Sequence, residues 1–279
     1  MGFPVFLKVT VFFGAWLGLW LPFAIPQSLL LKWRPGLPLS SQQRLPLLAS
    51  LYLVAPPIAL LTATLEKSTL ADCGLTWDAA TLASSSRGFA LGVFGLVLSF
   101  ALQSIAGWIS WNFPDRQLPE FPLSFPSRLA AWVLPSMSIL LPAFILAVWV
   151  AGTEELMFRG ILQNLLQAAY PIWIAAAISS TIFALLHLLW DIRETLPQLL
   201  GLWLMGMVLV WARIVDGGSL GLAWGLHAGW VWSMVSLDTA DIVRYTGQSP
   251  EWVSGISGKP LAGLLGIILL LVTGIAIGS

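Results

Sequence analysis

The sequence predicts an all-α fold, a polytopic membrane bundle of about eight transmembrane helices. The first reason is composition, since 58% of the residues are hydrophobic, 9% are charged and the mean hydropathy is +0.87. A soluble domain carries about 25% charged residues, and one soluble core could not bury so much apolar surface. The second reason is that apolar stretches of roughly 17–25 residues, the length of a membrane span, recur along the chain. We therefore expect an integral, multi-pass membrane protein.

Eight apolar segments account for nearly the whole chain. They comprise residues 5–25, 46–65, 88–109, 130–150, 171–190, 196–213, 219–237 and 260–278. The first could be a signal peptide because Lys8 precedes an apolar run, but its length and the missing cleavage site favour a retained helix. The proline-rich connection at residues 110–128 should be irregular. No separate soluble domain remains, so the chemistry must lie in the membrane or at its surface.

Charge and cysteine content exclude several classes of protein. The formal net charge is zero, so nothing indicates a nucleic-acid partner. Cys73 is the single cysteine, which excludes an intramolecular disulfide and a multi-cysteine metal site.

A polar cluster, Glu154-Glu155-Leu-Met-Phe-Arg159, interrupts the apolar sequence. Ionisable side chains inside a membrane are costly, so they usually mark a functional site. Residues 143–168 read as one helix through this cluster. Glu155 and Arg159 are four residues apart and can pair on one face, whereas Glu154 lies about 100° round and can face a cavity. The alternative is a plain structural ion pair near the membrane boundary.

The two histidines of the chain, His187 and His227, both lie well inside predicted spans. Either one alone could be a hydrogen-bonding group that joins two helices. Both together, with a glutamate pair on a third helix, indicate a shared polar site. Imidazole suits proton transfer near neutral pH and is a common metal ligand.

Glycines recur every four residues around His227. Gly217, Gly221, Gly225 and Gly229 form a stripe along one helix face that lets a neighbouring helix approach closely. His227 lies about 200° from that stripe. We therefore expect His227 to point away from the packed face and toward a catalytic cavity.

At these residues the sequence resembles the CPBP family of intramembrane proteases. This family includes the type II CAAX prenyl endopeptidases and bacterial bacteriocin-processing and self-immunity proteins. Its motifs are Glu-Glu-x-x-x-Arg, Phe-x-x-x-His, and His-x-x-x-Asn or a hydrophobic replacement. Here they read Glu154-Glu155-Leu-Met-Phe-Arg159, Phe183-Ala-Leu-Leu-His187 and His227-Ala-Gly-Trp-Val231.

The resemblance covers residues 130–237 and divides the chain into three parts. Residues 1–129 would be N-terminal transmembrane helices and linkers, residues 130–237 the CPBP-like catalytic core, and residues 238–279 a loop and a C-terminal transmembrane helix. The implied activity is that of an intramembrane endopeptidase that hydrolyses a peptide bond of a membrane-associated or lipidated protein. The implied partners are membrane lipid and a protein or peptide substrate.

The resemblance also implies a role for each motif residue. Glu154 would be the base that activates the hydrolytic water, and His187 would hold or share that water. Glu155 and Arg159 would orient the glutamate helix. His227 would stabilise the oxyanion of the tetrahedral intermediate, which needs a donor aimed at developing charge.

Val231 stands where many relatives of this family have asparagine. Valine cannot donate a hydrogen bond, and losing one oxyanion donor typically costs ~10²–10³ in rate. Another donor would have to replace the asparagine, or the activity would be weaker or absent. The alternative function is therefore a non-proteolytic membrane protein, which could be an immunity factor, a scaffold or a transporter. A transporter should carry paired broken helices in two halves, and the sequence has no such repeat.

The resemblance implies a divalent metal cofactor, and zinc is the first candidate. Glu154, His187 and His227 could supply one oxygen and two nitrogens and leave a position open for water. The same three groups could also work without metal. The chain has no His-Glu-x-x-His helix, the strongest zinc-protease signature.

Overall fold

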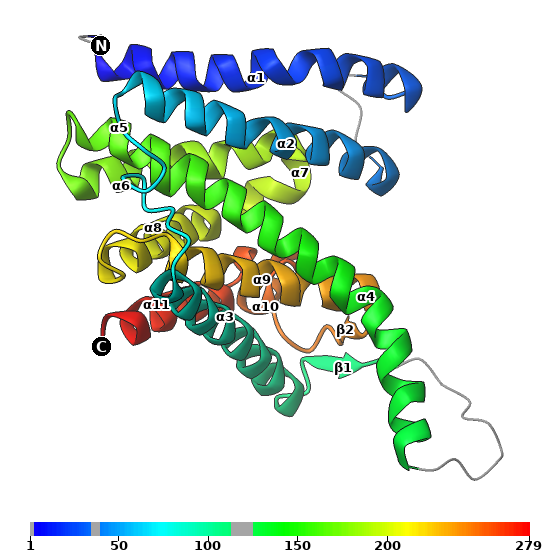
Figure 1. Cartoon of the computed structure of the whole chain (residues 1–279). Coiled ribbons are helices and arrows are strands. Elements are labelled where there is room, and N and C mark those ends of the chain that lie inside the picture. Colours follow the sequence, from blue (N-terminus) through cyan, green and yellow to red (C-terminus); the bar gives the residue numbers. More distant parts are fainter. Residues whose placement is uncertain (1–2, 35–39, 113–124) are drawn as a thin grey trace.

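The computed structural model describes residues 3–34, 40–112 and 125–279, and it confirms the predicted all-α membrane bundle. Figure 1 shows α1 and α2 side by side along one edge of the bundle and both chain ends at the same end of it. The helices are α1 (Val5–Leu30), α2 (Ser41–Leu65), α3 (Ala79–Ile105), α4 (Phe125–Glu154), α5 (Gln163–Gln167), α6 (Ile172–Leu186), α7 (Ile192–Thr195), α8 (Leu199–Val215), α9 (Gly221–Ala240), α10 (Glu251–Ser254) and α11 (Leu264–Gly278). A π-helix, η1 (Glu155–Leu162), joins α4 to α5.

Among the described residues, six helical segments are long and apolar enough to cross a membrane. They are Val5–Leu30, Pro46–Leu65, Ala79–Ile105, Ser136–Gln167, Ile172–Leu189 and Ile192–Val215. This makes the protein an integral, multi-pass membrane protein, but the predicted count of eight spans is not confirmed. The other two predicted spans are also helical. However, α11 has only 15 residues, and α9, although it has 20 residues, is less apolar than the six spans.

The glycine stripe of α9 lies against α3. A Cβ atom on Gly221, Gly225 or Gly229 would collide with the α3 backbone, which confirms the predicted close approach of a neighbouring helix. Gly217 differs from the prediction. It lies in the turn before α9 with a φ of +65° and nothing close to it, because α8 has already ended at Val215.

The helix predicted over residues 143–168 is continuous, but η1 widens its middle into a π-helix. Side chains from other helices bond to two of its carbonyls. The Ser179 hydroxyl donates to the Phe158 carbonyl at 3.1 Å, and the Arg213 guanidinium donates to the Arg159 carbonyl. Single π-helical turns occur frequently at functional sites.

Part of the connection predicted as irregular is ordered. Strands β1 (Ile109–Trp111) and β2 (Val243–Tyr245) form a small antiparallel sheet, and α4 already begins at Phe125. Pro126 lies in the first turn of α4, where proline is tolerated because its missing N–H has no partner in the helix. Residues 113–124 of this connection lie outside the described residues. The expected three-part division of the chain stays a prediction, although α3 of the first part packs closely on α9 of the second.

Candidate active site

The glutamate pair lies where α4 gives way to η1. Glu155 is fully buried, and its Oε1 accepts a hydrogen bond of 3.1 Å from Nη1 of Arg159, which confirms the predicted pair. The Arg159 guanidinium also lies over the Phe183 ring, 4.3 Å from its centroid. Such a cation–π contact stabilises a desolvated guanidinium. The pair is therefore buried between η1 and α6.

His227 of α9 lies between the two glutamates. Its Nδ1 is 2.7 Å from Oε1 of Glu155, and its Nε2 is 3.5 Å from Oε2 of Glu154. The ring is only 2% exposed and faces away from the glycine stripe, as predicted. It contacts the two glutamates, however, and does not line the cavity beside Glu154, toward which we expected it to point. Because both ring nitrogens face carboxylates, this placement differs from the oxyanion role that the resemblance implied.

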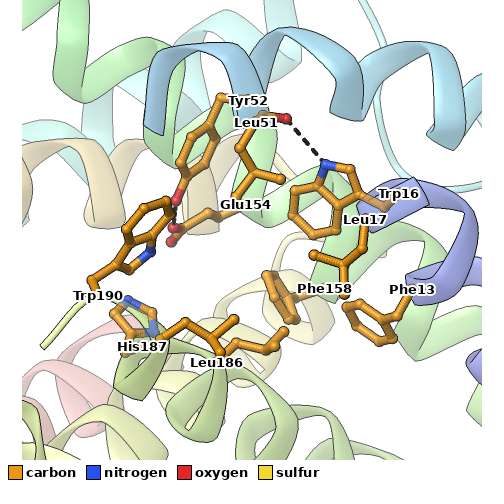
Figure 2. Close-up of a pocket in the computed structure, with 11 residues that line it drawn as sticks. Phe13, Trp16, Leu17, Leu51, Tyr52, Glu154, Phe158, Leu186, His187 and Trp190 are labelled. Atoms are coloured by element: carbon orange, nitrogen blue, oxygen red, sulfur yellow. Dashed lines mark hydrogen bonds between the residues drawn. The ribbon is translucent and has the colours of Figure 1, made fainter. Parts of the chain in front are cut away.

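Glu154 lines a cavity of about 60 Å³. On this measure a water needs roughly 10–15 Å³, so the cavity has room for the water of a hydrolysis. Its walls come from α1, α2, the α4–η1 junction, and the end of α6 with the turn that follows. They are formed by Phe13, Trp16, Leu17, Leu51, Tyr52, Glu154, Phe158, Leu186, His187, Leu189 and Trp190. Figure 2 shows Tyr52, Glu154, His187 and Trp190 on one side of this cavity and Phe13 and Phe158 on the other.

His187 lies in the wall of the same cavity, but it caps the end of α6 rather than lying mid-span as predicted. The chain enters a 3₁₀ turn at His187, and the apolar residues that follow conceal this helix end in the sequence. Nδ1 of His187 is 2.8 Å from the Phe183 carbonyl oxygen. A carbonyl can only accept, so Nδ1 carries the hydrogen and Nε2 is the acceptor of the neutral ring.

Phe183 packs against polar residues of all three motifs. Its buried ring lies 4.6 Å from the His187 ring and 6.2 Å from the His227 ring, centroid to centroid, in addition to its contact with Arg159. The motif contained Phe183, but sequence reasoning assigned it no role. Its position explains why an aromatic residue stands one helical turn before His187.

Sequence reasoning missed Tyr52 of α2. Its hydroxyl donates a hydrogen bond to Oε1 of Glu154, and the side chain lines the cavity and is buried. A signal was present in the sequence, because the chain has three tyrosines and Tyr52 alone lies within a predicted span. It was overlooked because the resemblance covers only residues 130–237.

The proposed zinc ligands do not gather in this arrangement. Across residues 3–34, 40–112 and 125–279, no three His, Cys, Asp or Glu side chains form a group that could hold a metal ion. The ring nitrogens of His227 face Glu154 and Glu155, and Nδ1 of His187 faces a backbone carbonyl. The set does not fit a zinc site in this geometry, so zinc stays a prediction from the sequence.

A comparison with protein families matches the part of the chain that carries this site. The model described as "Type II CAAX prenyl endopeptidase Rce1-like" matches residues 136–233, a segment that contains Glu154, Glu155, Arg159, His187 and His227 but not Tyr52. No curated protein and no solved structure matches the chain. Residues 136–233 of this integral membrane protein are therefore similar to the Rce1-like family of type II CAAX prenyl endopeptidases.

Proposed function

We propose that this protein is an intramembrane endopeptidase that hydrolyses a peptide bond near the C-terminus of a lipidated, membrane-associated protein. One observation carries the proposal. Glu154 lines a cavity with room for water, which His187 also lines, and both residues lie within the segment that matches a protease family. Carboxylate and imidazole are the side chains most used for general acid–base catalysis.

In the proposed reaction Glu154 is the general base. It takes a proton from water while the water oxygen attacks the scissile carbonyl carbon, and the C=O π pair moves to the carbonyl oxygen as an oxyanion. When the intermediate collapses, the C=O bond re-forms, the C–N bond breaks and its electron pair stays on nitrogen. The nitrogen takes the proton from Glu154, which leaves an amine, a carboxylic acid and the ionised base. No further reactant is needed.

His187 would hold the water in this reaction. Its Nδ1 hydrogen is committed to the Phe183 carbonyl, so its Nε2 can accept a hydrogen bond from a water in the cavity. With Glu154 in the same cavity wall, the water would have two acceptors, one for each proton. This orients a water oxygen lone pair toward a substrate carbonyl.

The buried cluster behind Glu154 would position the base. Glu155 is paired with Arg159, and the His227 ring lies between the two carboxylates, with Nδ1 2.7 Å from Glu155 and Nε2 3.5 Å from Glu154. We therefore assign His227, Glu155 and Arg159 to holding Glu154 in place rather than to contact with the oxyanion.

The substrate class follows from the family description and from the cavity walls. The matched family is described as acting on CAAX prenyl proteins, whose C-terminal motif carries a lipid on its cysteine. Apart from its few polar groups, the cavity is lined by aromatic and aliphatic side chains of membrane helices. Such walls suit the aliphatic residues that follow the modified cysteine.

The test is cleavage of a farnesylated, quenched-fluorescent peptide ending in Cys-aliphatic-aliphatic-X by the purified protein in nanodiscs. We expect cleavage by the wild type and a fall of ~10²–10⁴-fold in Glu154→Gln, because a general base contributes about that much. Glu251→Gln, at an exposed site far along the chain, is the matched control and should keep the wild-type rate.

Equal rates for Glu154→Gln and the wild type would refute the proposal. The unfarnesylated peptide tests the lipid requirement in the same assay, and we expect it to be cleaved more slowly. A cellular phenotype that survives Glu154→Gln would instead support the non-proteolytic alternative.

A further inference from the structure

We infer that Tyr52 is a catalytic residue whose hydroxyl donates a hydrogen bond to the oxyanion of the tetrahedral intermediate. The inference rests on the proposed hydrolysis and adds a residue from outside the segment that matches the family model. It would make α2 part of the active site, not only part of the surrounding bundle.

Tyr52 is held at the site by the packing of α1 on α2. The indole N–H of Trp16 donates to the Leu51 carbonyl at 3.0 Å, next to Tyr52 in the chain, as Figure 2 shows. The Tyr52 side chain is only 6% exposed, and its hydroxyl already touches the base, Glu154. A rigidly held donor beside the reacting atoms costs little reorganisation during the reaction.

The other donors around the cavity are largely committed. His227 does not line the cavity, and its two nitrogens face Glu154 and Glu155. The Nδ1 hydrogen of His187 and the indole hydrogen of Trp16 go to backbone carbonyls. Val231, where many relatives have a donor, is not a lining residue and could not donate. Two candidate donors remain in the wall, the Tyr52 hydroxyl and the Trp190 indole.

Tyr52 is favoured over Trp190 because it lies where the charge changes. In the ground state the Tyr52 hydroxyl donates a hydrogen bond to the Glu154 carboxylate. When Glu154 takes the proton from water, negative charge leaves the carboxylate and appears on the carbonyl oxygen. A hydroxyl hydrogen can rotate about its C–O bond, so the same donor can follow the charge to the oxyanion. That interaction is stronger in the transition state than in the ground state, which is the condition for catalysis.

The experiment compares single-atom changes in the farnesylated peptide assay. Tyr52→Phe keeps the ring and removes the hydroxyl, and we expect kcat to fall ~10²–10³-fold, the usual cost of losing an oxyanion donor, with KM nearly unchanged. Tyr170→Phe makes the same change at an exposed tyrosine and should keep the wild-type kcat. Trp190→Phe removes the competing donor and should lower kcat by less than tenfold.

A second measurement separates catalysis from positioning. A peptide phosphinate, which mimics the tetrahedral intermediate, should bind to Tyr52→Phe more weakly by about the same factor as kcat/KM falls. Measurable binding also shows that the variant is folded. A loss of kcat with wild-type phosphinate affinity would mean that Tyr52 only positions Glu154, and it would overturn the inference.

The outcomes also separate this inference from the proposed function. Wild-type kcat in Tyr52→Phe combined with inactivity of Glu154→Gln overturns the inference alone. Wild-type kcat in both variants overturns the proposed function and the inference with it.

Discussion

Nδ1 of His227 lies 2.7 Å from Oε1 of Glu155, and this contact joins α9 to the π-helix at the centre of the bundle. Glu155 Oε1 also accepts from Arg159, so the carboxylate, the guanidinium and the imidazole form one buried network. Glu154, the preceding residue, lines the cavity. The two carboxylates thus have different surroundings, although they are adjacent in the sequence.

Removing the charge of Arg159 should destabilise the protein. The guanidinium is 1% exposed, and Arg159→Met would leave Glu155 as a buried charge without its cation. Breaking a buried ion pair in this way costs about 3–5 kcal/mol. We expect the free energy of unfolding, measured by denaturant titration in detergent micelles, to fall by that amount. Arg193→Met, at an exposed arginine, is the control, and equal losses in the two variants would contradict the prediction.

The role of His227 can be read from kinetics. In the proposed reaction His227 orients the base, so we expect kcat of His227→Gln to fall by roughly 10²-fold, the lower range for general-base effects. Because both ring nitrogens face glutamates, phosphinate affinity should fall much less than kcat/KM. Equal losses of phosphinate affinity and kcat/KM would instead support the oxyanion role for His227.

Replacing glycine by alanine should have different effects on stability at a packed and at an unpacked position. Gly225→Ala would drive a methyl group into the α3 backbone and should destabilise the protein by about 1–3 kcal/mol, as overpacking does. Gly14→Ala in α1 meets no atom within 4 Å and should be neutral or stabilise by up to about 1 kcal/mol, because alanine favours helix. Unfolding midpoints measured side by side check both, and a stabilised Gly225→Ala variant would show that the two helices are further apart.

Metal content tests the prediction made from the sequence against the geometry. Since no three ligand-type side chains gather in the described part of the chain, we expect elemental analysis of the purified protein to find well below one zinc per chain. We also expect the peptide assay to survive dialysis against a chelator. One zinc per chain, lost in a His187→Ala/His227→Ala double variant, would establish the predicted metal centre and require these side chains to rearrange around the ion.

The class of the protein and the local geometry of its motifs could be predicted from the sequence. A membrane span depends mainly on length and apolarity, which are properties of a contiguous segment, so composition was enough to predict a multi-pass helical bundle. The pairing of Glu155 with Arg159 and the direction of His227 relative to the glycines follow from helix periodicity, which relates residues within two turns. Both features depend on neighbours in the chain, and the structure confirms both.

The tertiary structure decided everything that joins distant segments. Tyr52 reaches Glu154 across 102 residues, and no periodicity relates two helices so far apart in the chain. Two carbonyls of the π-helix accept hydrogen bonds from Ser179 of α6 and Arg213 of α8, side chains that lie on other helices. The surroundings of His227 likewise depend on where α4 and α9 cross. Local patterns therefore identified the ionisable side chains of the candidate site, whereas packing between helices determined which of them meet and which face the cavity.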